Sequence, residues 1–440
     1  MHKTPSADGN RRTFTFSFWV KRGELTSHNP IAEVYSSGEN VSQFYFNASD
    51  QFTWYESQTS NKINLTTNAV QRDPNAWYHI VVKVDTTEST NTDRIKIYIN
   101  NELQTITSAS NTYPDQNFQS YMNSTHDAIE IGRTQYNSNQ FDGYLAEVCM
   151  IDGSALAPSS FGEADEDSPT IWKPIDVSGL TFGTNGFYLD FEDSSNLGND
   201  ANGGTDLTEV NLAATDQSTD TCTNNFATLN PLLLNSGLTF SEGNLNLVSS
   251  NANYRHAIST IAVQNGKWYA EFKAVSGFSS VDKSVGIYRT DNAYNPTNGL
   301  GNYTTGTTWS YGAHGDVRTN NGVSQTGVGT FTDGDIIAVA MDLDNNKLYF
   351  AKNNTWINSG DPESGATGTG SYAITSGDFY HFAVTSISSG GAALWSSNFG
   401  SPNYANSSDA ADANGYGAFE YAPPSGYLSL CTKNLGSDGG

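Results

Sequence analysis

The sequence predicts an all-β protein with two antiparallel β-sandwich domains and an irregular linker between them. Apolar and polar residues alternate with a period of two in many short segments, as they do in half-buried strands. Helical periodicity is nearly absent. The 440 residues include 41 Gly, 22 Phe, 23 Tyr and 8 Trp, a composition typical of chains rich in strands and loops. Many short strands separated by turn signals favour sandwiches over parallel α/β units.

The first predicted domain covers residues 1–175. Its pattern is clearest in residues 12–20, where Phe14, Phe16 and Phe18 point to one side of a strand. The polar segment 85–93 reads as the tip of a hairpin. The other strands of this domain are expected at residues 77–85, 94–100, 128–132 and 144–151.

The predicted linker covers residues 176–235 and contains one strand-like segment, residues 186–191. A second domain is expected over residues 236–440. Asp344, Asn345 and Asn346 form a tight hairpin signal between two alternating segments. The strands of this domain are expected at residues 267–274, 335–343, 347–350, 379–387 and 392–399.

The charge of the chain excludes two classes of partner. It has 21 basic and 46 acidic residues, a net charge of -25, although only 15% of all its residues are charged. Such a chain repels phosphate backbones and anionic membrane surfaces, so we expect neither nucleic acid nor membrane insertion. No signal peptide or membrane-spanning run is expected. Three dispersed cysteines, Cys149, Cys222 and Cys431, predict no disulfide framework and a buried free thiol at Cys149.

Short stretches in both predicted domains resemble known families. Residues 16–22 (FSFWVKR), 77–85 (WYHIVVKVD), 97–101 (IYINN) and 141–147 (FDGYLAE) together resemble a laminin-G-like, concanavalin A-like lectin/glucanase domain. Residues 266–272 (GKWYAEF), 334–344 (GDIIAVAMDLD), 347–353 (KLYFAKN) and 421–427 (YAPPSGY) resemble a SPRY domain. Both resemblances imply concanavalin A-like, jelly-roll sandwiches.

The order of the two domains carries a further resemblance. With the segment 224–232 (NNFATLNPL) between them, they resemble virion proteins of tailed bacteriophages. This implies a non-enzymatic virion surface protein of a tail fibre or head fibre. It would form homo-oligomers, contact other virion subunits and bind a host surface glycan or protein. The alternatives are a structural decoration or adaptor protein of the capsid or tail, and a polysaccharide depolymerase.

Aromatic residues in loops are the candidate ligand-binding groups. Sugar rings offer apolar C–H faces and hydroxyls, which suit exposed Trp and Tyr beside Asn, Asp or Arg. Packing of these aromatics in the sandwich cores is the alternative for each of them. The candidate residues are Trp54, Tyr55, Arg133, Tyr136, Tyr303, Trp309, Tyr311 and His314.

No motif for catalysis or for a cofactor emerges from the sequence. Retaining glycosidases need two closely spaced carboxyl groups, and the nearest patterns, at 163–165 and 190–192, lack the required third acid or a distinctive context. The segment 342–346 imitates the start of a calcium loop, but Lys347 replaces the required Gly. The sequence leaves open whether a structural calcium ion is bound elsewhere in the chain.

The N-terminal strand of the lectin-like domain is a separate question. Domains of this type begin with a strand before Phe16, and only residues 1–13 are available for it. The strand is therefore expected either to be missing or to be supplied by another chain. An open sheet edge would invite pairing with a neighbouring subunit.

Overall fold

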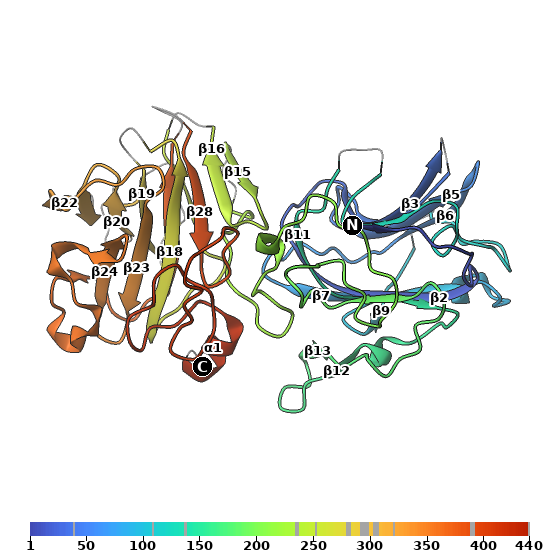
Figure 1. The fold of residues 1–440 in the computed structure, drawn as a ribbon. Coiled ribbons are helices and arrows are strands. Elements are labelled where there is room, and N and C mark those ends of the chain that lie inside the picture. The colour runs from blue at the N-terminus through green and yellow to red at the C-terminus, as the bar shows by residue number, and fades with distance from the viewer. Residues whose placement is uncertain are drawn as a thin grey trace. The chain divides into compact units, whose positions relative to one another are not determined.

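The computed structural model of the chain has two compact units, Met1–Gln217 (unit 1) and Ser218–Gly440 (unit 2), each built from antiparallel sheets (Figure 1). The predicted all-β class is therefore confirmed. The structure describes residues 1–37, 40–107, 110–135, 139–233, 237–250, 253–278, 283–290, 299–301, 308–319, 322–387 and 392–438.

Helices are few and short among these residues. The α-helix is α1 (Thr432–Asp438), and no helix in this part of the chain has the length and apolar character that crossing a membrane requires. The 3-10 helices are η1 (Asn91–Asp93), η2 (Pro158–Ser160), η3 (Ala214–Asp216), η4 (Ile357–Ser359) and η5 (Pro362–Thr367).

Unit 1 is a sandwich of two six-stranded sheets. The β3 sheet has the order β1 (His2–Lys3), β10 (Ile129–Ile131), β3 (Asn29–Ser37), β4 (Asn40–Phe46), β5 (Phe52–Ser57), β6 (Asn61–Thr66). The β2 sheet has the order β14 (Phe187–Leu189), β11 (Gly143–Asp152), β2 (Thr13–Arg22), β7 (Trp77–Asp85), β8 (Ile95–Ile99), β9 (Glu102–Leu103). Phe14, Phe16 and Phe18 of β2 are fully buried in the core between the sheets, as their alternation predicts.

The outer face of the β2 sheet is covered by the chain that follows β11. Phe161, Val177 and Phe182 of this segment pack on Val81 and Cys149 of the sheet. The segment includes the small hairpin of β12 (Gly162–Ala164) and β13 (Trp172–Pro174). Cys149 is buried and free, so the predicted buried thiol is confirmed.

The N-terminal strand is present in the same chain, contrary to the expectation that it is missing or supplied by another subunit. His2 pairs with Glu130 of β10, and the Met1 side chain is buried in the core of unit 1. On the other side, His2 N donates to Thr208 O over 2.9 Å, and Thr208 N donates back to His2 O over 2.7 Å. The expectation failed because only two residues pair, too few for an alternation pattern.

Unit 2 is also a two-sheet sandwich. The β18 sheet has the order β15 (Leu238–Ser241), β16 (Asn246–Ser249), β28 (Leu394–Asn398), β18 (Lys267–Ser276), β23 (Ile336–Asp342), β24 (Lys347–Lys352), β25 (Thr355–Trp356), with β26 (Tyr372–Ala373) also on β24. The β19 sheet has the order β17 (Arg255–Ile258), β27 (Tyr380–Ser386), β19 (Ser284–Arg289), β20 (Thr308–Gly312), β21 (Asp316–Thr319), β22 (Gly322–Thr326). Asp342 pairs with Lys347 across the predicted tight hairpin, which is confirmed.

A covering segment also lies on the outer face of the β18 sheet. Phe419 and Tyr427, from the chain after β28, pack on Tyr269 of β18 and Tyr349 of β24. Both faces of β18 are therefore buried, the inner one by Trp268 and its neighbours in the main core.

The segment expected as an irregular connection, 176–235, is divided between the two units. Its strand-like part becomes β14 in the β2 sheet, and Leu207 lies in the core of unit 1. Leu229 lies in the core of unit 2. Single apolar residues anchor this polar chain to each core, and such isolated anchors leave no periodic signal in the sequence.

Candidate functional site

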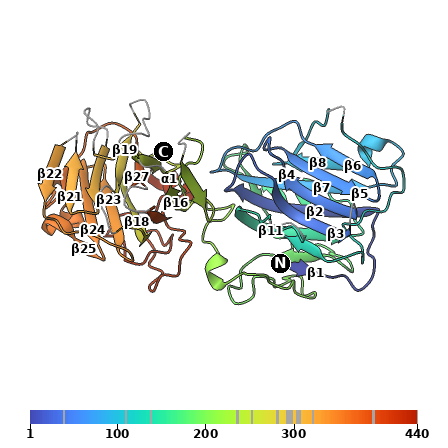
Figure 2. The same cartoon turned by 90° about the horizontal axis from the view of Figure 1, so that it is seen from above.

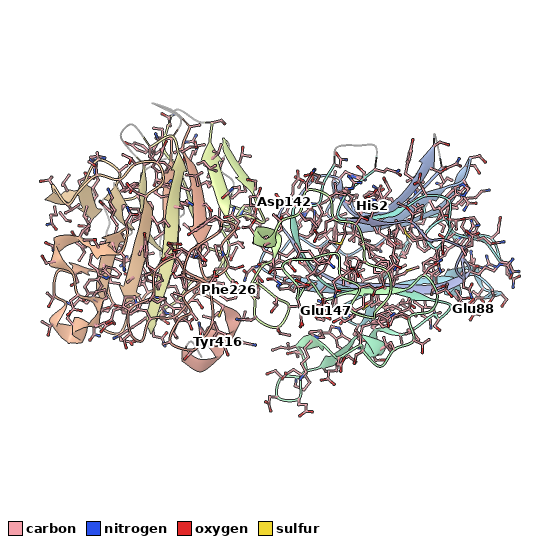
Figure 3. The ribbon with its side chains drawn as sticks, viewed as in Figure 1. His2, Glu88, Asp142, Glu147, Phe226 and Tyr416 are labelled. Carbon is pink, nitrogen blue, oxygen red and sulfur yellow. The ribbon has the colours of Figure 1, made fainter. Side chains whose placement is uncertain are left out.

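The outer face of the β3 sheet carries a row of polar and aromatic side chains that spans all six strands. The pairing His2↔Glu130, Glu130↔Glu33, Glu33↔Gln43, Gln43↔Tyr55 and Tyr55↔Asn64 places these residues side by side. Figure 2 shows these strands from above, and Figure 3 labels His2 at the β1 end of the row. We call this surface the β3-sheet face; it consists of His28, Glu33, Gln43, Tyr45, Tyr55, Asn64, Glu130 and Arg133.

A hydrogen-bonded layer lies at the base of the β3-sheet face. The Glu33 carboxylate accepts from Gln43 Nε2 at 3.1 Å and from the backbone N–H of Gln135 at 2.7 Å. His28 Nε2 lies 3.0 Å from Gln43 Oε1, so the ring nitrogen is the donor of this pair. Burial raises the pKa of Glu33, the Gln135 N–H opposes this, and the charge of Glu130 adds to it. The layer fixes the Gln43 amide and the His28 ring in one orientation.

A partly buried ion pair lies next to this layer. Arg133 Nε and Nη2 donate to the two oxygens of Glu130 over 2.6 and 2.9 Å, a bidentate arrangement. The Glu130 side chain is 3% exposed and that of Arg133 is 29% exposed. The hydrogen bond to Glu130 raises the pKa of Arg133. Arg133 therefore presents part of a rigidly held guanidinium group to solvent.

Half-exposed tyrosine rings stand above the layer. Tyr45 of β4 stacks on His28, with ring centroids 4.5 Å apart and an angle of 28° between the planes. Tyr55 of β5 is half-exposed like Tyr45. Burial raises the pKa of Tyr45, and the neighbouring Tyr55 adds to the shift. The face thus combines flat aromatic rings with fixed amide, carboxylate and guanidinium groups, which is the chemistry that a sugar ring requires.

The two glutamates of the face are both engaged by neighbouring hydrogen-bond donors. Retaining and inverting enzymes need one carboxyl group that donates a proton and another that attacks or activates water. Both oxygens of Glu130 accept from Arg133, and both oxygens of Glu33 accept from neighbouring N–H groups. Each carboxyl group therefore holds its neighbours in fixed positions.

The structure places two of the residues proposed from the sequence on the β3-sheet face, Tyr55 on β5 and Arg133 just after β10. Tyr136 and Tyr303 lie outside the described residues. Trp54 points to the opposite side of β5, is fully buried in the core, and donates from Nε1 to Ser42 Oγ over 3.0 Å. It cannot stack on a sugar, which corrects the expectation of an exposed platform at this residue.

The expectation of exposed aromatic rings at Trp309 and Tyr311 in unit 2 is also wrong. Trp309 and Tyr311 are 2% and 0% exposed, because the inward face of β20 places both in the core between the sheets. Trp309 Nε1 donates to Ala373 O over 3.0 Å, and Tyr311 Oη donates to Gly329 O over 2.6 Å. His314 is exposed and lies 2.9 Å from Asp316, on a different sheet from the β3-sheet face.

Sequence reasoning missed Glu33, Gln43, Tyr45 and Glu130. A signal was present, because the outward residues of β3, β4 and β5 alternate with Phe44, Phe46 and Phe52 of the core. This alternation predicts the face of each residue but not the order in which the strands pair.

A serine–histidine pair elsewhere in unit 1 has the wrong polarity for a nucleophile. His79 Nε2 lies 2.9 Å from Ser17 Oγ, and Trp172 Nε1 donates to His79 Nδ1 over 2.9 Å. Because Nδ1 accepts, the proton of the neutral ring is on Nε2, which donates to Ser17 and cannot remove its proton. Burial lowers the pKa of His79 to about 3, so the ring stays neutral.

The acidic pairs suggested by the sequence lie at the end of a strand and in an exposed hairpin. Asp190 follows the end of β14, and Phe191 has a left-handed backbone with φ of 58°, so Asp190 and Glu192 do not share a strand face. Glu163 and Asp165 both lie within 3.6 Å of Lys173 Nζ in the exposed hairpin. In the ranges that the structure describes, no group of three or more His, Cys, Asp or Glu side chains is arranged to hold a metal ion.

Comparison with known proteins supports the assignment of the first domain. Residues 2–159 match a family model described as the concanavalin A-like lectin/glucanases superfamily. The predicted resemblance of unit 1 to this class of domain is therefore confirmed over these residues. The match covers less than half of the chain, so it assigns one domain and not the whole protein. No curated protein matches the chain.

Two solved structures are similar to parts of the chain. The SPRY domain of human HERC1 is 17% identical, with a TM-score of 0.29, and the match covers 38% of this chain and 96% of that chain. The PSpry domain of TRIM65 is 11% identical, with a TM-score of 0.29, and the match covers 39% of this chain and 88% of that chain.

Proposed function

We propose that the chain binds carbohydrate through the β3-sheet face of unit 1. The observation that carries this proposal is the pair of half-exposed tyrosines, Tyr45 and Tyr55, over a fixed layer of hydrogen-bonding groups. Aromatic rings stack on the C–H faces of sugars, and fixed polar groups select their hydroxyls. The match of residues 2–159 to a superfamily of lectins and glucanases supports the same ligand class.

The proposed activity is binding without hydrolysis. It rests on Glu33 and Glu130, whose oxygens are all engaged by neighbouring donors. The alternative, a polysaccharide depolymerase, requires one of them to act on the substrate. Release of reducing sugar from a bound polysaccharide, absent in a Glu33→Gln variant, would favour the enzyme.

The proposed setting is the surface of a phage virion, in a tail fibre or head fibre with several copies of the chain. The support for this setting is the resemblance of the domain order and of the segment 224–232 to such proteins. Many copies would turn weak sugar contacts into firm attachment to a host. The rival is a decoration or adaptor protein that contacts other virion subunits. A chain that assembles onto particles but binds neither host cells nor glycans would favour this rival.

The direct test is a glycan array probed with the full-length chain and three variants. Tyr45→Ala and Tyr55→Ala should each reduce the affinity for the bound glycan by about tenfold or more, because each removes a stacking ring. Tyr98→Ala is the matched control, because Tyr98 is a half-exposed tyrosine packed on the covered face of the other sheet. It should leave the affinity unchanged.

Thermal unfolding of the same variants separates binding from folding. The three substitutions should change the melting temperature by similar small amounts, since each removes a half-exposed ring. Equal glycan affinity in all four proteins would refute the assignment of the β3-sheet face, even if the chain binds a glycan elsewhere.

A further inference from the structure

Unit 2 carries an open cleft at the end of the β18 sheet where strand β18 begins. Three segments surround it: the turn before β18, the hairpin between β23 and β24, and residues 426–428. The residues that line it are Asn265, Gly266, Lys267, Asp344, Gly426 and Leu428. Its volume is about 340 Å³, and small-molecule sites have volumes of about 300–1,000 Å³. The cleft is therefore large enough for one small ligand.

Hydrogen bonds hold the three segments of the cleft together. Gly266 N donates to Asp344 Oδ1 over 2.8 Å, and Leu343 N donates to Gly266 O over 3.0 Å, so the turn is joined to the hairpin. Leu428 N donates to Lys267 O over 2.9 Å, so the third segment is joined to β18. Because its walls are fixed by the fold, binding in the cleft costs little ordering of the chain.

Two glycines keep the cleft open. Gly266 and Gly426 both have a φ of 80°, in the left-handed region that favours glycine. A Cβ atom on Gly426 would meet no atom within 4 Å, so the space beside this residue is empty. Leu428, which is 4% exposed, is the one apolar side chain among the described residues that line the cleft. Polar groups therefore dominate the contacts that a ligand could make there.

The three polar side chains of the cleft differ in what they offer a ligand. Asp344 is exposed, and its Oδ2 accepts no hydrogen bond from the described residues. The amide of exposed Asn265 makes no hydrogen bond within the same part of the chain, and an amide both donates and accepts. The Lys267 side chain is 26% exposed, and its ammonium group only donates. An acceptor, a donor and a group that does both thus line one cleft.

The charges at the cleft argue against an ionic ligand. Lys267 Nζ lies 3.6 Å from Oδ2 of the fully buried Asp342, which balances the charge of the ammonium group. Asp344 adds a further negative charge. An anion would be repelled by Asp344, and a bare cation would meet the ammonium group. A neutral ligand with several hydroxyl groups fits the cleft better, because each hydroxyl both donates and accepts.

We propose that this cleft binds neighbouring hydroxyl groups of one neutral sugar residue. Asp344 Oδ2 accepts from one hydroxyl, and the ammonium group of Lys267 donates to another. The Asn265 amide binds a hydroxyl as donor or acceptor. The cleft belongs to unit 2 and the β3-sheet face to unit 1, so this second sugar site does not depend on the first.

The test uses ligand-observed NMR and titration on the full-length chain carrying Tyr45→Ala and Tyr55→Ala, which removes the site proposed in unit 1. The probes are glucose, galactose and mannose, each compared with its uronate. At least one hexose should bind, with an affinity that does not fall as salt rises, and no uronate should bind more tightly than its hexose. Binding of none of the hexoses, or tighter binding of a uronate, would overturn the proposal. Neither result would bear on the β3-sheet face, because this protein lacks its two rings.

Variants locate the binding in the cleft. Asp344→Asn replaces the Oδ2 acceptor with a donor and should reduce the affinity for the hexose by about tenfold or more. Asp333→Asn is the matched control, which should leave the affinity unchanged. Asp333 is also exposed and also accepts one backbone N–H, that of Phe278 at 2.7 Å, but it does not line the cleft.

A second variant covers the case in which Asp344→Asn fails to fold. Asn265→Ala should reduce the affinity by about threefold or more, because it removes a hydrogen-bonding group of the cleft. It should not lower the melting temperature, since this exposed amide bonds to none of the described residues. An affinity equal to that of the control in every folded cleft variant would refute the location.

Discussion

The β3-sheet face of unit 1 and the outer face of the β18 sheet in unit 2 share a nearly buried glutamate but differ in what that glutamate binds. Each has a nearly buried glutamate in a strand, Glu33 of β3 and Glu271 of β18. Glu33 accepts from a side chain and a nearby backbone N–H. Glu271 accepts from the backbone N–H groups of Glu420 at 2.9 Å and Tyr421 at 2.8 Å, which belong to the covering segment.

The difference shows that a buried carboxylate on the outside of a sandwich has two uses. On the β18 sheet it fixes a covering segment, whose Phe419 and Tyr427 then seal the face. On the β3 sheet it orients a layer beneath rings that stay half-exposed. The covered face therefore contributes to stability, and the face with half-exposed rings is the one suited to a ligand.

The largest expected effect distinguishes core aromatics from face aromatics. Trp54→Ala and Trp309→Ala should each lower the free energy of unfolding of their own unit by about 3–5 kcal/mol, because each leaves a large cavity. Tyr55→Ala, one residue from Trp54 but on the other side of β5, should cost about 1 kcal/mol or less. Urea denaturation, followed for each unit's transition, measures these values. If the Trp309→Ala protein keeps its stability but loses glycan binding, Trp309 belongs to the ligand site and this prediction is wrong.

The second-largest expected effect tests how Glu271 holds the segment that covers the outer face of the β18 sheet. Glu271→Ala should destabilise unit 2 by about 3–4 kcal/mol, because two partly buried backbone N–H groups lose a fully buried acceptor. Glu363→Ala is the matched control. Glu363 also accepts a backbone N–H of this segment, that of Ser425 at 2.9 Å, but it is exposed to water. The control should cost less than about 1 kcal/mol. Equal losses in the two variants would show that burial of Glu271 does not matter.

The stability of unit 2 should also depend on pH, through the protonation of Glu271. Burial raises the pKa of Glu271 to about 7 from an ordinary value of 4.5, against the opposing effect of the two N–H donors. The folded unit therefore keeps a proton that the unfolded chain loses above pH 4.5. The stabilisation is complete below pH 4.5, decreases as the pH rises, and is lost as the pH passes 7, a change of about 3 kcal/mol.

The Glu271→Gln variant isolates this contribution, because glutamine does not titrate. The difference in unfolding free energy between the natural chain and the variant should decrease as the pH rises from 4.5 to 7. Urea denaturation over this pH range measures it. A difference that is constant with pH would show that Glu271 titrates alike in the folded and unfolded chains.

The sequence predicted the strands and sandwiches because their signal is local. The alternation of Phe14, Phe16 and Phe18 gives both the strand and its inward face. The sequence could not show what covers an outer face, since Glu271 and Tyr421 are 150 positions apart. For the same reason the sequence predicted both Tyr55 and Trp309 as ligand-binding residues, although Tyr55 lies on an outer face and Trp309 lies in a core. Tyr55 and Arg133 were found by residue type, whereas Glu33 and Gln43 needed the strand order.

The smallest expected effect compares the two faces directly. Glu33→Gln replaces one carboxylate oxygen with an NH₂ group, which must face either Gln43 Nε2 or the Gln135 N–H, both of them donors. One hydrogen bond is lost, but water can replace it beside the half-exposed Tyr45 and Arg133. We therefore expect a loss of about 1 kcal/mol or less, with a weaker affinity for glycan because the Gln43 amide is no longer fixed. A loss as large as the one expected for Glu271→Ala, measured by urea denaturation, would mean that water does not reach this face, and the contrast between the two faces would not hold.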